Sequence, residues 1–295
     1  GNFSLHGKST ENGLSSFQAL ATAIAAQVGT GNIAGAATAL AIGGPGAIFW
    51  MWIAAFLGMA TIYAEAIMAQ KYKTVGADGQ VTGGPVYYIR AAFKGTFGKV
   101  LAGIFAILIT LALGFMGNAV QSNSIAASFH TAFGIPQWIM GLVVAVIAIF
   151  VFMGGMKRIA KVTETIVPFM AALYIIGSLI VIIYNYKNIP YAFASIFIGA
   201  FSPSSVVGGA AGATVKLALT KGVARGLFSN EAGMGSTPHA HARAKVENPH
   251  KQGLAAMISV FIDTFIILNL TVFSILTTGV LDSGKEGTAL TQAAF

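Results

Sequence analysis

Two short segments combine glycines with polar side chains inside otherwise apolar stretches. The first is Gln27-Val28-Gly29-Thr30-Gly31-Asn32-Ile33-Ala34-Gly35, and the second is Phe228-Ser229-Asn230-Glu231-Ala232-Gly233-Met234-Gly235-Ser236. A glycine weakens a helix by about 1 kcal/mol relative to alanine, so each segment is predicted to interrupt a helix. Free N–H groups at an interruption suit a carboxylate, whereas freed carbonyls suit a small cation.

The first segment holds the leading candidates for a substrate carboxylate, which are the backbone N–H groups of Thr30 and Gly31. Its glycines alone are equally typical of close helix packing. The polar side chains of Gln27, Thr30 and Asn32 favour a binding site. The Asn32 amide either offers oxygen to an ion or caps the second half-helix, and the sequence leaves both roles open.

A further polar pair, Asn118 and Gln121, lies three residues apart and therefore shares one helix face. Such residues contribute about 0.6 kcal/mol when they only join helices. The alternative is that they contact a substrate, and the spacing alone does not decide between the two roles.

Three carboxylates, Glu65, Glu231 and Asp263, fall inside apolar stretches. Each costs about 2.5–3.5 kcal/mol or more in a membrane, so each is a functional candidate for a gate or an ion path. Glu65 lies near Lys71 and is expected to be solvated or salt-bridged. Glu231 is expected to pair with Arg225 or to line the ion path. Asp263 is protonated, ion-paired or an ion ligand, and these alternatives stay open.

The composition identifies the elements that must position these residues. Of 295 residues, 56% are hydrophobic and 9% are charged, whereas a soluble domain carries about 25% charged residues. The chain is therefore an integral membrane protein of the lipid bilayer. It has no cysteine, which excludes disulfides and thiolate metal sites. His239 and His241 have no third ligand nearby, so a loop role is favoured and no metal other than a coupling ion is expected.

Seven stretches are long and apolar enough to be predicted as membrane spans. They are Leu14–Ile42, Gly46–Gln70, Val100–Phe129, Pro136–Met156, Thr165–Tyr186, Ser204–Pro238 and Gly253–Leu281. The sixth is interrupted by charges and is expected to be discontinuous. Short loops between the spans leave no room for a separate soluble domain.

The basic residues set the expected orientation. With the N-terminus in the cytoplasm, twelve of the 17 Lys and Arg residues fall in inside segments, and only Lys187 and Lys285 fall outside. The sequence thus predicts a plasma-membrane protein with a cytoplasmic N-terminus. Topology explains the net charge of +8, so no nucleic-acid partner is expected.

The two interrupted segments echo each other. Asn32-Ile33-Ala34-Gly35 matches Asn230-Glu231-Ala232-Gly233 at three of four positions, and each precedes another span. Such pairing is the sequence pointer to an inverted-repeat transporter. We expect one transmembrane domain over 1–295, with a first five-helix repeat at 14–186 and a partial second repeat at 204–295. A partial repeat predicts that the chain is a fragment of a longer protein.

Four stretches resemble the sodium:alanine symporters, the alanine or glycine:cation symporter family of the amino acid–polyamine–cation superfamily. They are Gly29–Gly35, the Gly43-Gly44-Pro45-Gly46…Phe49-Trp50-Met51-Trp52 block, Gly117–Ser124 and Gly226–Gly233. The resemblance covers nearly the whole chain. It implies an all-α, LeuT-type inverted-repeat fold, apparently truncated, with broken first and sixth core helices.

The resemblance also implies a function. It is the import of a small neutral amino acid, alanine or glycine, by symport with sodium, with no other cofactor and no enzymatic activity. A channel or a proton-coupled transporter is the alternative, and the oligomeric state stays open. The implied substrate residues are Thr30, Gly31, Asn118, Gln121, Phe228, Ser229 and Asn230. The implied ion ligands are carbonyls of Ala25, Gln27 and Val28 and the side chain of Asn32.

Overall fold

The first interruption leads into the central helix of the protein. The computed structural model describes residues 24, 27–77, 79–202 and 215–295. After a bend at Val28 and Gly29, a π-helical turn, η1 (Gly31–Gly35), continues into α2 (Ala36–Gly43). Gly44 then adopts a φ of 71°, which favours glycine, and the chain turns into α3 (Gly46–Lys71).

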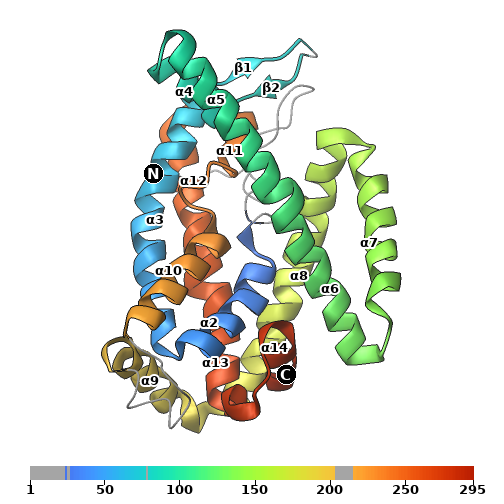
Figure 1. Ribbon diagram of the computed structural model, residues 1–295, viewed down its shortest axis with the longest axis vertical. Helices are drawn as coiled ribbons and strands as arrows, with labels where there is room; N and C mark the ends of the chain where they lie inside the picture. Colours follow the sequence, from blue (N-terminus) through green and yellow to red (C-terminus); the bar gives the residue numbers. More distant parts are fainter. Residues whose placement is uncertain (1–23, 25–26, 78, 203–214) are drawn as a thin grey trace.

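A small hairpin and two helices follow α3. Strands β1 (Thr74–Val75) and β2 (Val81–Thr82) pair antiparallel, with Thr74 opposite Thr82. The next helices are α4 (Pro85–Ala92) and the continuous unit of α5 (Gly95–Ile109), the π-helical η2 (Thr110–Gly117) and α6 (Asn118–Phe133). Figure 1 shows the hairpin and α4 at one end of this long unit.

The middle of the chain forms a long hairpin and then crosses to the bundle. Its elements are α7 (Gln137–Phe152), α8 (Gly155–Tyr184), the short η3 (Tyr186–Asn188) and α9 (Ile189–Phe201). Helix α7 lies at the edge of the molecule in Figure 1, beside α6. Large apolar side chains on this hairpin are exposed, for example Ile147, Phe150 and Leu173, as a lipid-facing surface requires.

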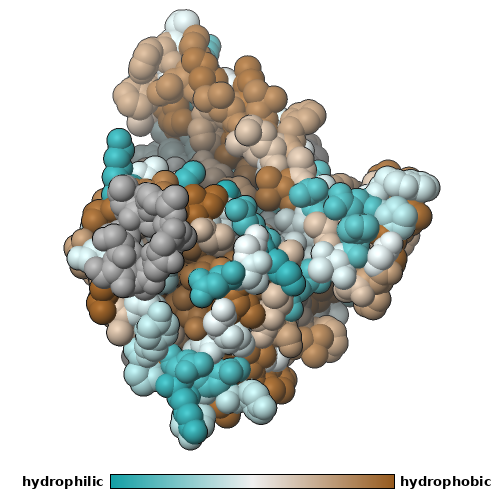
Figure 2. Space-filling view, turned by 60° about the horizontal axis from the view of Figure 1, so that its bottom comes forward, coloured by the Kyte–Doolittle hydropathy of each residue, from teal (hydrophilic) through white to brown (hydrophobic). Residues whose placement is uncertain are grey.

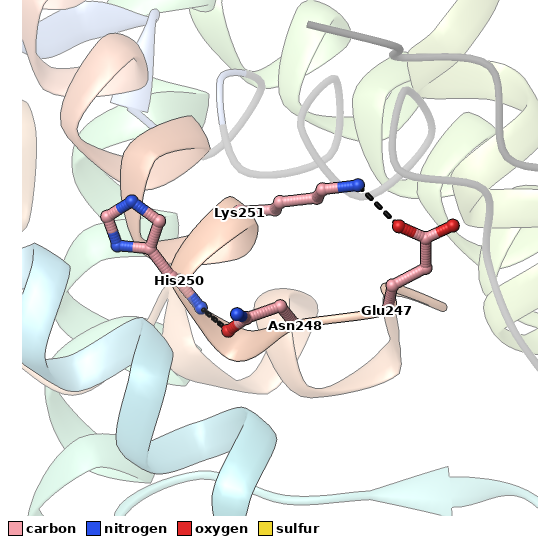
Figure 3. Close-up of polar contacts among 4 residues, drawn as sticks. All are labelled: Glu247, Asn248, His250 and Lys251. Carbon is pink, nitrogen blue, oxygen red and sulfur yellow. Dashed lines mark hydrogen bonds and ion pairs between the residues drawn. The ribbon is translucent and has the colours of Figure 1, made fainter. Parts of the chain in front are cut away.

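The last part of the chain returns through the centre of the bundle. Helix α10 (Val215–Asn230) is followed by the second interruption, α11 (Pro238–Arg243) and α12 (Pro249–Phe261). Asn248 caps α12, because its Oδ1 accepts a hydrogen bond from His250 N at 2.9 Å (Figure 3). The π-helical η5 (Ile262–Leu268), α13 (Asn269–Thr278), η6 (Val280–Ser283) and α14 (Gly287–Ala294) complete the order.

Small residues bring the central helices together. Helix α10 packs along α3 through Gly222 and Gly226, one turn apart. A Cβ on Gly226 would lie 3.4 Å from Met51 Cα, and one on Gly222 would overlap the carbonyl of Ala47. Close approach of backbones is the role of small residues in membrane helices, where lipid gives no hydrophobic drive to associate.

The structure confirms the all-α prediction and revises the spans. Four helical units among the described residues are long and apolar enough to cross a membrane: Gly46–Lys71, Gly95–Phe133, Lys157–Tyr184 and Pro249–Thr278. Gly31–Gly43 and Gln137–Phe152 are shorter apolar helices. Figure 2 shows hydrophobic residues over much of the surface, with hydrophilic ones gathered in patches. The predicted spans at 14–42 and 204–238 lie partly outside the described residues.

Helix α9 has no counterpart among the predicted spans. Its 13 residues are too few to cross a bilayer, so the search for spans passes over it. It packs against the start of α3, where Gly46 and Gly199 come so close that a Cβ on Gly46 would overlap the backbone of Gly199. This contact gives the Gly43-Gly44-Pro45-Gly46 motif a packing role.

Candidate functional site

The two interruptions touch each other in the middle of the bundle. A Cβ built on Gly31 would lie 2.9 Å from Ser229 Cα and 3.3 Å from Ser229 Oγ. After Asn230 the chain leaves the helix through three residues with positive φ, namely Glu231 (55°), Gly233 (84°) and Gly235 (81°). The first interruption is milder, because the helix bends at Val28 and Gly29 and then continues as a π-helical turn.

A buried carboxylate joins the two interruptions to a third irregular helix. Asp263, on η5, is fully buried and accepts hydrogen bonds from Asn32 Nδ2 (2.7 Å) and Ser229 Oγ (3.0 Å). Thr264 Oγ1 donates to the same carboxylate at 3.0 Å. Asn32 belongs to the first interruption and Ser229 to the second, so one acidic side chain is shared by three segments distant in sequence.

Amide side chains fix the backbone on both sides of this cluster. Asn32 Oδ1 accepts a hydrogen bond from Gly29 N at 2.9 Å. The amide therefore stabilises the bend at Gly29 and does not cap the helix that follows. Gln27 Nε2 donates to the carbonyl of Asn230 at 2.9 Å, which ties the first interruption to the second. Asn230 Oδ1 in turn accepts from Ala232 N at 3.1 Å.

A cavity of about 600 Å³ lies beside the interruptions. Four of the predicted substrate residues line it: Gly31, Asn118, Gln121 and Phe228. Thr30, Ser229 and Asn230 are not among its lining residues. The predicted ion ligand Gln27 also lines it, whereas Ala25 lies outside the described residues, and Val28 and Asn32 are buried away from it.

The cavity extends beyond the residues that the sequence predicts to contact the substrate. Helix α11 forms one wall with His239, Ala240 and Arg243, and η2 forms another with Leu113, Gly114 and Gly117. Sequence reasoning missed both walls. The one available signal was the pair Gly114 and Gly117 just before Asn118. The cavity volume exceeds what alanine would fill, so size alone does not select the substrate.

Each of the three π-helical segments in the described part of the chain carries a residue of the site. Gly31 belongs to η1, Gly114 to η2 and Asp263 to η5. Helix η2 also places the following Gln121 against the first interruption, since a Cβ on Gly29 would lie 3.3 Å from the Gln121 amide atoms. π-Helical turns occur frequently at functional sites, and here they turn polar groups toward one region.

The other two predicted carboxylates have different partners from those expected. Glu65 is buried and accepts from Gly233 N at 3.0 Å, so it supports the second interruption instead of being solvated or salt-bridged. Glu231 accepts a hydrogen bond from Ser236 Oγ and not from Arg225, and it lines the cavity, so its place on an ion path stays a prediction. For both carboxylates the second interruption supplies the donor, a backbone N–H for Glu65 and a hydroxyl for Glu231.

Several polar side-chain atoms at the interruptions have no partner within the part of the chain that the structure describes. They are Gln27 Oε1, Thr30 Oγ1 and Asn230 Nδ2. Buried polar groups are normally hydrogen-bonded, and an unpaired one costs about 1–3 kcal/mol. Gln27 and Thr30 belong to the first interruption and Asn230 to the second, and Gln27 also lines the cavity, where a polar ligand could approach it.

A histidine, His241, joins α11 to the helices behind it. The Gln70 side-chain amide on α3 donates to the carbonyls of His241 and Ala244, the latter at 2.9 Å. The Gln252 side-chain amide and His241 Nδ1 are hydrogen-bonded at 2.6 Å. No group of three or more His, Cys, Asp or Glu residues among those described is placed to hold a metal.

We expect acid to destabilise the protein through this histidine. Burial lowers the pKa of His241 from 6.5 to about 4. Between pH 6.5 and 4 the unfolded chain binds a proton on this histidine and the folded chain does not. The free energy of unfolding therefore decreases as the pH is lowered, and at pH 5 it is about 2 kcal/mol below its value at neutral pH. Thermal unfolding of the purified protein between pH 7.5 and 5 measures this loss. A His241→Gln variant should flatten the dependence, and the exposed His130→Gln should not. An equal slope in His241→Gln would contradict the assignment.

Taken together, the apolar helices and the cluster at two touching interruptions define an integral membrane protein with a polar site inside its helical bundle. A profile described as the sodium:alanine symporter family matches residues 3–295. The chain belongs to this family, whose members are transporters and not enzymes.

Three relatives illustrate the similarity. The chain is 48% identical over 277 residues to the "Putative sodium/proton-dependent alanine carrier protein YrbD" of Bacillus subtilis, covering 94% of this chain and 56% of the relative. It is 44% identical over 299 residues to the "Sodium/alanine symporter AgcS" of Methanococcus maripaludis, covering 99% and 65%. It is 45% identical over 287 residues to the "Probable sodium/glutamine symporter GlnT" of Bacillus subtilis, covering 97% and 58%. The chain thus spans between 56% and 65% of the length of these relatives.

Proposed function

We propose that this protein imports a small neutral amino acid, alanine or glycine, across the plasma membrane by symport with sodium. The observation that carries the proposal is the contact of two interrupted helices at Gly31 and Ser229, beside a cavity and a shared buried carboxylate. An ion and a substrate placed at one contact can each stabilise the same arrangement of both helices. That shared dependence is the physical basis of coupling.

The substrate carboxylate is proposed to bind at the first interruption, at the backbone of Thr30 and Gly31. The unpaired Thr30 hydroxyl supports this placement, as does the position of Gly31 in the cavity wall. Asn118 and Gln121 supply polar contacts from the facing wall, and Phe228 supplies an apolar one. Ser229 and Asn230 act indirectly, because Ser229 is hydrogen-bonded to Asp263 and Asn230 to Gln27.

For sodium we propose hard oxygen ligands around Asp263, together with the carbonyls predicted at 25, 27 and 28. The Asp263 carboxylate and the Ser229 hydroxyl offer such oxygens. Asn32 would add its amide oxygen by turning over, which exchanges its present bonds to Gly29 N and Asp263. The carboxylate gives the site a negative charge that backbone carbonyls lack.

The fold proposal remains the LeuT-type inverted repeat with a cytoplasmic N-terminus, with the repeats at 14–186 and 204–295. Support comes from the matching places of the two interruptions, before α3 and before α12. In this orientation α11 and its Arg243 lie at the cytoplasmic end. The wall of the cavity that α11 forms is then its cytoplasmic wall.

Uptake into proteoliposomes tests the proposal. The full-length protein should concentrate labelled alanine when sodium is high outside and choline replaces it inside. Uptake should fall to the level of protein-free liposomes when choline is on both sides. Uptake that is the same with and without the sodium gradient would contradict symport.

Proton coupling is a second candidate, because the site contains a titratable side chain. Asp263 is buried and bonded to both interruptions, and the name of one relative includes a proton. Under this alternative a pH gradient alone, at equal sodium, should drive the same uptake. No uptake under a pH gradient would leave sodium as the coupling ion.

A further inference from the structure

The wall of the cavity carries a distinctive pair of hydrogen-bond acceptors. Of the described residues that line it, Glu231 provides the only carboxylate. Gln27 lines the same cavity and is only 2% exposed. Neither side chain is needed to hold the Asp263 cluster, whose donors are Asn32, Ser229 and Thr264.

The direction of the Gln27 amide follows from its one partner. A carbonyl can only accept, so the group that faces the Asn230 carbonyl at 2.9 Å must be the nitrogen, Nε2. The oxygen, Oε1, therefore points the other way, and it has no partner within the described chain. A buried acceptor without a donor is rare, so the position suits a donor brought by a ligand.

The backbone of Glu231 gives an independent sign of function. It is the only non-glycine residue with positive φ in the described part of the chain. Gly233 and Gly235, in the same turn, also have positive φ, which glycine adopts without strain because it has no side chain. Glycine would relieve the strain at 231 as well, so the presence of a carboxylate at this strained position points to a use for the side chain.

The two acceptors share one anchor. Glu231 follows Asn230 directly, and the Asn230 carbonyl is the group that holds Gln27. Asn230 Oδ1 also fixes the turn by accepting from Ala232 N at 3.1 Å. The carboxylate and the amide oxygen are therefore positioned by the same short stretch of backbone. Gly31 lies on the segment of Gln27 and lines the same cavity.

We propose that Gln27 Oε1 and the Glu231 carboxylate bind the ammonium group of the amino acid substrate. An ammonium carries only donors and a positive charge, which matches two acceptors of which one is anionic. The substrate carboxylate then lies toward Thr30 and Gly31. This assignment rests on the proposed function, and it makes Glu231 the residue that distinguishes an amino acid from a plain carboxylic acid.

Binding of alanine and of propionate, which lacks the ammonium group, tests the assignment. Isothermal titration of the purified full-length protein would be run in sodium and in choline. Glu231→Gln should weaken alanine binding about ten- to hundredfold, the usual size of a lost hydrogen bond to a charged group. Propionate binding should stay unchanged. Glu231→Gly removes the carboxylate and the strain together, so it should fold and give the same result.

The matched control is Glu247→Gln, at an exposed carboxylate paired with Lys251 at 2.6 Å, outside the cavity (Figure 3). It should bind alanine and propionate as the wild type does. An unchanged ratio of alanine to propionate affinity in both Glu231 variants would overturn the assignment. Loss of sodium stimulation with that ratio intact would also overturn it, because the carboxylate would then serve the ion. A wild type without sodium-dependent alanine binding would instead contradict the proposed function itself.

Discussion

Replacement of Asp263 by asparagine is expected to remove the sodium dependence of alanine binding. The carboxylate provides the negative charge of the proposed ion site and accepts from Asn32, Ser229 and Thr264. An asparagine keeps the shape but loses the charge, and its NH₂ group must face at least one of these donors. Coupling between ligands is typically worth 1–3 kcal/mol, so sodium stimulation of about 5- to 150-fold should be lost.

The control for this variant is Asp282→Asn, on the exposed η6 helix. Alanine affinity would be measured by titration in sodium and in choline for both variants. Asp282→Asn should keep the full ratio between the two conditions. A folded Asp263→Asn protein that also keeps it would show that sodium does not depend on this carboxylate.

Replacement of Gly31 by valine is expected to abolish alanine uptake. Its Cβ would lie 2.9 Å from Ser229 Cα, which is backbone and cannot rotate away. The side chain would therefore force the two interruptions apart. Overpacking of this kind costs about 1–3 kcal/mol, equivalent to a loss of roughly 5- to 150-fold. A direct clash of the valine side chain with the substrate carboxylate, proposed to bind at Gly31, would add to this loss.

Gly35→Ala is the matched control, since it lies in the same π-helical turn. Its Cβ would meet only the Thr30 carbonyl, at 3.7 Å, which is ordinary contact. Uptake by this variant should stay within about twofold of the wild type, as expected for a change that creates no clash. Wild-type alanine uptake by a folded Gly31→Val protein would show that transport does not depend on the contact between the two interruptions.

The interruptions could be predicted from the sequence because glycines and polar residues stand out within apolar stretches. Gly29, Gly31, Gly233 and Gly235 mark them directly. The membrane class follows from composition, and the family follows from motifs such as the one at Gly43. These features depend on local sequence, which is why they were accessible without a structure.

The partners across the bundle could not be predicted in the same way. Helix η5 contains no glycine or proline, so nothing local marks its π-helical turn. The bond between Asn32 and Asp263 joins residues 231 positions apart, and Gln27 and Asn230 are 203 apart. The packing of η5 on η1 sets the first distance, and the packing of α10 on η1 and α3 sets the second. The roles of Asp263 and Gln27 therefore depend on the fold.

The central claim is that sodium and an amino acid cross together through one site at the touching interruptions. Alanine-driven entry of radioactive sodium into proteoliposomes of the full-length protein tests it most directly. Alanine added outside should accelerate sodium entry, and the acceleration should vanish in Asp263→Asn. Sodium entry that does not respond to alanine in the wild-type protein would contradict the account.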